Sequence, residues 1–207
     1  MTRHKIFFKR LKTYTVLSVM LFVFVLMSFV INNTTTNKDS TKEIVDSVAS
    51  IQAFMEVYKV LMSPRCMNCH PAGDVPLQGD DSHLHTMSPQ RGKDGHGVYA
   101  MKCGNCHQPT NTPGLNTPPG NPKWALPPAD MKMVFEGKSP KQLALQIMDF
   151  KQNGNKTKEQ LIEHARDTLV KAGWNMGEGR KPPPLSYEEF VVAWDTWIKT
   201  GGSAPKE

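Results

Sequence analysis

Cysteine is scarce in this chain of 207 residues, and all four cysteines lie within two short motifs. None remains for an iron–sulfur cluster pattern, and none lies beside the N-terminal apolar run to accept a lipid. Acidic residues are absent from the first 31 positions, where five of the 25 Lys and Arg residues lie. The rest of the chain has 20 basic and 19 acidic residues, a net charge of 20 minus 19, or +1. This near-neutral remainder predicts no nucleic-acid partner.

The N-terminus places a basic segment, 1–12, before an uncharged run, 13–31. This order predicts a cytoplasmic tail and a transmembrane helix, with the rest of the chain exported. The strongly apolar part has 16 residues, between the core of a signal peptide and a full span of about 20. No small-x-small cleavage site follows, which favours an uncleaved signal anchor over a cleaved signal peptide. Residues 32–42 predict a polar tether, and 43–207 a globular domain.

Both cysteine motifs have the same pattern of two cysteines followed by histidine: Cys66-Met67-Asn68-Cys69-His70 and Cys103-Gly104-Asn105-Cys106-His107. Cysteines at i and i+3 lie on one side of a helical turn, where both thiols can add to the vinyl groups of one haem. The next residue, histidine, then points its imidazole at the iron. The sequence therefore predicts two covalently bound haem c groups, held by Cys66, Cys69, Cys103 and Cys106, with His70 and His107 as iron ligands.

Two other uses of paired cysteines are open at this point. A zinc site could take one ligand pair from each motif, but 33 residues separate Cys69 from Cys103, more than the usual interval of about 15–20. A redox-active disulfide of the thioredoxin type needs only one pair. Neither alternative accounts for a histidine directly after both pairs, so the haem interpretation is favoured.

Helical patterns surround the motifs and predict a mainly α fold. Apolar residues spaced by three and four predict a helix at about 43–62, which Pro64 ends. A capping box at Ser186 and Glu189 starts a last helix that we expect to pack across the first. Two further helices are predicted at about 140–150, after Ser139 as N-cap, and at 158–171, after Thr157 as N-cap with Gln160 at the third helical position.

Long proline-rich segments separate these helices. Residues 108–130 include seven prolines, and residues 182–184 are three more, so neither segment can be helix or central strand. Leu115, Trp124 and Leu126 within the first segment predict that it packs against a haem rather than serving as a linker. The predicted fold therefore has helices and irregular segments around two haems.

The ligand on the other side of each iron separates an electron carrier from a catalyst. For the first haem the candidates are His83, His85 and Met87, with His96 and Met101 further on. The loop at 79–87 brings the two imidazoles and the thioether to one place, and His85 is favoured among them. His164 is a candidate for the second haem, at the edge of an apolar stripe, although it could instead lie at a core boundary. These histidines could also be solvated residues without a ligand role.

Parts of the chain resemble class I cytochromes c. Two predicted features are similar to that class: a helix leads into the haem-binding turn, and the first and last helices cross. The segment Met131-Lys132-Met133-Val134-Phe135 resembles its methionine-ligand loop, where a Lys-Met-x-Phe stretch precedes a helix. This resemblance implies cytochrome c-like helices and a thioether ligand for the second haem from Met133, with Met131 close behind. Methionine also fills apolar cores, and this chain has 12.

At a larger scale residues 66–179 resemble small dihaem c-type proteins that serve as subunits of isoquinoline 1-oxidoreductase-like molybdenum hydroxylases. The match is carried by the first haem motif with Pro71-Ala72-Gly73-Asp74, by Gln78-Gly79-Asp80-Asp81 and His83-Leu84-His85, by 91–97, and by the stretch from Glu163-His164 to Trp174. The resemblance implies an electron-accepting subunit of a molybdopterin-dependent dehydrogenase. This chain has no segment typical of pterin binding, so the hydroxylase chemistry would belong to another polypeptide.

These observations predict a dihaem cytochrome c, anchored in the bacterial inner membrane with its haem domain in the periplasm. It would transfer electrons from a dehydrogenase to the respiratory chain, with no catalytic activity of its own. A dihaem peroxidase with one open iron site is the alternative, and a haem-based sensor is a further one. Both alternatives need an iron with an open or displaceable sixth position.

Overall fold

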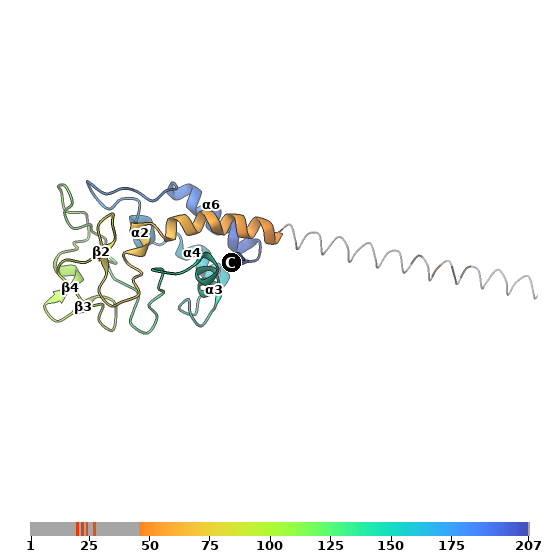
Figure 1. Cartoon of the computed structure of the whole chain (residues 1–207), viewed down its shortest axis with the longest axis horizontal. Coiled ribbons are helices and arrows are strands. Elements are labelled where there is room, and N and C mark those ends of the chain that lie inside the picture. The colour runs from red at the N-terminus through yellow and green to blue at the C-terminus, as the bar shows by residue number, and fades with distance from the viewer. Residues whose placement is uncertain (1–19, 21, 23, 25–26, 28–45, 207) are drawn as a thin grey trace, which may run out of the picture. The chain divides into compact units, whose positions relative to one another are not determined.

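The computed structural model describes residues 20, 22, 24, 27 and 46–206 (Figure 1). The chain divides into two units, Met1–Val45 and Asp46–Glu207. Residues 20, 22, 24 and 27 of the first unit are helical and exposed. Within the described part of the chain, no helix is both long enough and apolar enough to cross a membrane. The predicted basic tail and tether lie outside the described residues, as does most of the predicted anchor, so all three stay predictions.

The second unit is mainly helical, as the sequence predicts, and it also has a few short strands. A helix is described from 46 to 61 and is followed by α2 (Pro64–Met67). The strand β1 (Leu77–Gln78) pairs antiparallel with β2 (His83–Leu84), and β3 (Gly97–Val98) pairs with β4 (Met101–Lys102). The later helices are η1 (Cys103–Asn105), α3 (Pro140–Met148), α4 (Lys158–His164), α5 (Thr168–Ala172) and α6 (Tyr187–Lys199).

All three predicted helix starts are confirmed as complete capping boxes. The side chains of Ser139, Thr157 and Ser186 each accept a hydrogen bond from a backbone N–H three residues later. In each case the Gln or Glu side chain at that later position accepts one in return from the cap residue's own N–H. These reciprocal bonds satisfy donors that the first helical turn leaves unpaired. The helices therefore begin where local side-chain chemistry places them.

The single helix predicted at 158–171 is wrong, because the chain forms α4 and α5 with a break between them. The Asp167 carboxylate accepts a hydrogen bond from the Leu169 N–H at 2.9 Å. Asp167 therefore acts as the N-cap of α5 and leaves the helical conformation. The break places His164 at the last residue of α4.

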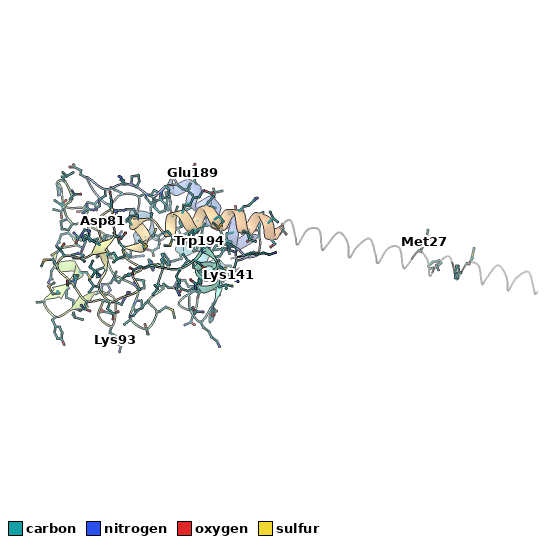
Figure 2. All side chains as sticks on the ribbon, in the orientation of Figure 1. Met27, Asp81, Lys93, Lys141, Glu189 and Trp194 are labelled. Atoms are coloured by element: carbon teal, nitrogen blue, oxygen red, sulfur yellow. The ribbon has the colours of Figure 1, made fainter. Side chains whose placement is uncertain are left out.

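The hydrophobic core is formed by the helix at 46–61, α3, α4 and α6, and contacts between the first and last of these confirm the predicted packing of the terminal helices. The rings of Phe54 and Trp197 have centroids 4.5 Å apart, and both side chains are fully buried. Ser50 donates a hydrogen bond to the Trp197 carbonyl at 2.9 Å. Trp194, labelled in Figure 2, donates from its indole to the Leu161 carbonyl of α4 at 2.8 Å. In Figure 1, α3, α4 and α6 lie at one end of this unit, and β2, β3 and β4 at the other.

Candidate functional site

The first motif lies on α2 and the turn that follows it. Pro64 occupies the first helical position, where a backbone N–H would have no partner within the helix, so its absence costs no hydrogen bond. The Cys69 N–H donates to the Cys66 carbonyl, and the His70 N–H donates to the Met67 carbonyl. This turn brings both cysteines together, as their spacing predicts. Burial raises the pKa of the Cys66 thiol to about 12 and that of Cys69 to about 11, which keeps both thiols protonated.

His70 is held on two sides by residues far along the chain. Its Nδ1 lies 2.7 Å from the Met133 carbonyl oxygen, and its ring stacks on Phe135 with centroids 3.9 Å apart. Burial lowers the pKa of His70 to about 4, so the imidazole is neutral. A neutral ring that donates from Nδ1 to a carbonyl has its lone pair on Nε2. That nitrogen is therefore prepared to bind a metal.

The second motif repeats this arrangement in a different local structure. η1 carries Cys103, and both the Cys106 and His107 N–H groups donate to its carbonyl. His107 Nδ1 lies 2.7 Å from the Pro119 carbonyl oxygen, and the ring stacks on Trp124 with centroids 4.1 Å apart. Burial lowers the pKa of His107 as well. Both motif histidines thus have a carbonyl partner at Nδ1 and an aromatic ring against one face.

The proline-rich segment at 108–130 forms part of the wall around the second motif. It supplies the Pro119 carbonyl and the Trp124 ring, and Leu126 is only 8% exposed. Leu115 is 71% exposed and is not among the residues that line the cavity, so it takes no part in this wall, and the packing of the segment against a haem stays a prediction. The segment is irregular because prolines occupy positions that regular structure would require for hydrogen bonds. Sequence reasoning identified Trp124 as a packing residue but did not predict its stack on His107.

His85 lies with the second motif rather than with the first, where the loop interpretation placed it. The ring centroids of His85 and His107 are 6.4 Å apart, and the ring planes are inclined at 69°. Two imidazoles on opposite sides of one metal ion, with metal–nitrogen bonds of about 2.0–2.1 Å, have centroids roughly 6 Å apart. The observed distance fits two histidines facing one metal ion, but the Met87 N–H donates to His85 Nδ1 at 3.3 Å, so binding through Nε2 would require that hydrogen bond to break.

The other predicted ligands of this loop have different surroundings. His83 Nδ1 lies 2.6 Å from Asp81 Oδ1 on an exposed hairpin. Met87 and Met101 line the cavity described below, although Met87 is 62% exposed. His96 is exposed, and its backbone N–H donates to Asp94. Of the histidines proposed for this role, only His85 has a ring contact with a motif histidine among the described residues.

Met133 lies at the first motif, whereas its resemblance to a methionine-ligand loop assigned it to the second haem. Its backbone has φ of 47°, its carbonyl faces His70, and its half-buried side chain packs against the core. Met131 is half-buried beside Gly154. His164, considered for the second haem, is close enough to His70 for its charge to lower the pKa of that residue. The His164 side chain is exposed, and among the described residues this electrostatic effect alone links it to the first motif.

A cavity of about 320 Å³ lies between the two motifs. Its wall includes Cys69 from the first motif and Cys103, Cys106 and His107 from the second. The charge of Cys103 contributes to the raised pKa of Cys69, which agrees with their proximity. Leucine, methionine, proline and tryptophan side chains form much of the remaining wall: Pro76, Leu77, Met101, Trp124, Leu126 and Met176. The volume and the apolar wall are typical of a cofactor site.

The geometry fits haem better than a bare metal ion. Among residues 46–206 no group of three or more His, Cys, Asp and Glu side chains is placed to hold a metal ion. Haem needs only a protein ligand along its axis, two thiols at its edge and an apolar wall. The second motif and the cavity provide all three from described residues.

Comparisons with known proteins leave the family open. No protein-family model, no curated protein and no solved structure matches the chain. The proposed function therefore rests on the chain's own residues, on their geometry and on the sequence resemblances given above.

Proposed function

We propose that this chain is a dihaem c-type cytochrome that transfers electrons. The observation that carries the proposal is the repeated histidine arrangement. His70 and His107 each have Nδ1 at 2.7 Å from a carbonyl oxygen, so each has Nε2 free for iron. Each histidine follows two cysteines with the spacing for thioether bonds to one haem. Either feature alone is common, but the two together at both motifs favour two covalently bound haems.

The protein's own residues hold and tune the cofactors. Cys66 and Cys69 would hold the first haem, and Cys103 and Cys106 the second. When bound, haem supplies one-electron cycling between Fe(III) and Fe(II). The Met133 and Pro119 carbonyls orient the proximal imidazoles and increase their basicity as ligands. Phe135 and Trp124 fix the ring planes and exclude water from one face of each ligand.

The sixth ligand decides whether an iron can bind a substrate. We infer that His85 completes the ligation of the second iron, because its ring centroid lies 6.4 Å from that of His107. At the first iron, His164 is our candidate, because it lies near His70. Two histidine ligands on each iron leave no open position, which favours an electron carrier over a peroxidase or a sensor.

The wider assignment rests on the sequence. The apolar run at 13–31 supports an anchor in the inner membrane, with the cytochrome c-like haem domain in the periplasm. The resemblance of residues 66–179 to subunits of molybdenum hydroxylases supports a molybdopterin-dependent dehydrogenase as electron donor. The respiratory chain is then the acceptor.

The test is the haem content and spin state of the full-length chain, produced together with a c-type haem maturation system. We expect two covalently bound haems per chain by mass spectrometry, and low-spin signals alone in electron paramagnetic resonance (EPR). The double variants C66A/C69A and C103A/C106A should each retain one haem. A wild-type chain without covalent haem would refute the proposal. A high-spin signal from one haem would instead favour the peroxidase or sensor.

A further inference from the structure

The cavity between the motifs has a one-sided charge. The charged residues in its wall are Arg65, Lys102 and Arg180, and no Asp or Glu is among the described residues that line it. Lys102 is exposed and Arg65 is paired with Asp80, which leaves Arg180 as the cation of this wall without an ion-pair partner among the described residues. The wall is therefore suited to a ligand that is apolar over most of its surface and carries negative charge at one edge.

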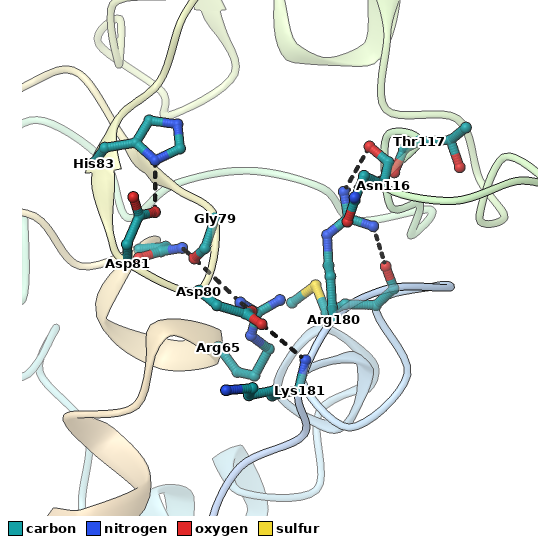
Figure 3. Close-up of polar contacts among 11 residues, drawn as sticks. Arg65, Gly79, Asp80, Asp81, His83, Asn116, Thr117, Arg180 and Lys181 are labelled. Atoms are coloured by element: carbon teal, nitrogen blue, oxygen red, sulfur yellow. Dashed lines mark hydrogen bonds and ion pairs between the residues drawn. The ribbon is translucent and has the colours of Figure 1, made fainter.

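Arg65 lies directly before Cys66 and is 7% exposed. Figure 3 shows its guanidinium facing the Gly79–Asp80 turn. Nη2 donates to the Gly79 carbonyl at 3.2 Å and forms an ion pair with Asp80. Nε is buried and has no hydrogen-bond partner among the described residues. A buried guanidinium normally satisfies all of its donors, so Arg65 has unused binding capacity.

Arg180 approaches the same cavity from the segment before α6. Its Nη1 donates to the Met176 carbonyl at 2.9 Å, and its Nη2 donates to the Asn116 and Thr117 carbonyls (Figure 3). All of these partners are neutral. Burial and the charge of Arg65 both lower the pKa of Arg180, which agrees with two neighbouring cations. Asp80 pairs with Arg65, lies close enough to Arg180 for its charge to act on the pKa of Arg180, and also accepts from the Lys181 N–H.

We propose that Arg65 and Arg180 bind the propionate carboxylates of the haem attached at Cys103 and Cys106. Haem carries two propionates at one edge, and guanidinium groups bind carboxylates with charge-assisted hydrogen bonds. The inference rests on the proposed function, because it requires the second haem to occupy this cavity. It adds that a residue of the first motif's helix, Arg65, positions the second haem. The Arg65 side chain would then connect the first motif directly to the second haem, in addition to the closeness of the two sites.

The test is a redox titration of the full-length, haem-loaded chain, comparing wild type with R180Q, R180K and K181Q. Arg180 is the position to change, because Arg65 also ties α2 to the Gly79–Asp80 turn and its loss could prevent folding. Lys181 is the matched control, since it is exposed and lies outside the cavity wall. The single-motif cysteine variants assign each potential to its haem.

Loss of a cation beside the propionates disfavours the electron-rich reduced state. We expect R180Q to shift the reduction equilibrium of the second haem about tenfold toward Fe(III), which is 59 mV for a one-electron couple. The pH at which this potential begins to vary should rise, because the propionates lose a stabilising charge. R180K should keep most of the wild-type potential, and K181Q nearly all of it.

Three results would overturn the inference: an unchanged second potential in R180Q, equal shifts in R180Q and K181Q, or a shift confined to the first haem. The haem content of the wild-type chain is measured in the same samples. A chain without haem refutes the proposed function, whereas a fully loaded chain with an insensitive potential refutes the propionate site alone.

Discussion

Replacement of His85 by alanine should change one haem and leave the other unchanged. The ring of His85 faces His107 at a centroid distance of 6.4 Å, and it belongs to the loop after β2 rather than to either cysteine motif. In the proposed dihaem protein, the variant would remove one iron ligand but retain every thioether bond and both motif histidines. The second iron should then become five-coordinate and high-spin, while the first stays low-spin. Because the chain has two haem motifs, about half of the low-spin EPR intensity should disappear.

The neighbouring residue His83 provides the control for this experiment. It lies on the same hairpin, but its ring is bound to Asp81 at 2.6 Å and is exposed. H83A should therefore keep the full low-spin signal. Added imidazole should restore the low-spin signal of H85A, because it can occupy the place of the lost ring. H164A is expected to remove the other half of the signal. If H85A kept all of its low-spin intensity, or lost both signals, the pairing of His85 with His107 would be refuted.

Three further predictions concern stability. W197A should lower the free energy of unfolding by about 3–5 kcal/mol in urea denaturation, because a fully buried ring is lost from the core; a loss below 1 kcal/mol would contradict this packing. G95A should destabilise the fold by at least about 1–3 kcal/mol, since Gly95 has φ of 82° and a Cβ would overlap the Leu126 carbonyl; unchanged thermal stability would refute this close approach. Arg166 holds the pKa of Asp195 below its usual value, so this pair stabilises the fold above the unfolded pKa of about 3.9, and the contribution is lost as pH falls through the folded pKa. D195N should lose about 1 kcal/mol at pH 7 and little in acid, and an equal loss at both pH values would exclude the ion pair as the cause.

Local features of the sequence predicted the parts of the fold that depend on neighbouring residues. The three capping boxes involve residues three positions apart, so Ser139, Thr157 and Ser186 could be recognised without a structure. The turn that joins each cysteine pair to its histidine is local in the same way. The break between α4 and α5 was missed because Asp167 can either continue a helix or cap one. In the fold its side chain caps α5, and the spacing of apolar residues does not indicate whether an Asp will cap a helix or continue one.

The candidate site was less predictable, because its contacts join distant segments. Sequence reasoning assigned His85 to the first haem, but the fold places its ring against His107 of the second motif. Met133 was recognised by the residues around it, but its functional contact with His70 is made by the backbone carbonyl, which every residue has. Phe135 and Trp124 stack on the histidines from positions that no spacing rule connects to the motifs. Nothing in the sequence indicates that Arg65 and Arg180 line the same cavity, because they are far apart in the chain.

The two proximal histidines depend on segments at different distances along the chain. His107 receives its carbonyl from 12 residues downstream, whereas His70 receives its own from 63 residues downstream. During synthesis from the N-terminus, the first motif therefore emerges early but the partners of its histidine emerge late. The carbonyl and ring partners of His107 are both present once Trp124 has emerged, before Met133 and Phe135. We therefore expect His107 to gain its two partners before His70 does, so that the arrival of residues 133–135 limits the assembly of the first motif.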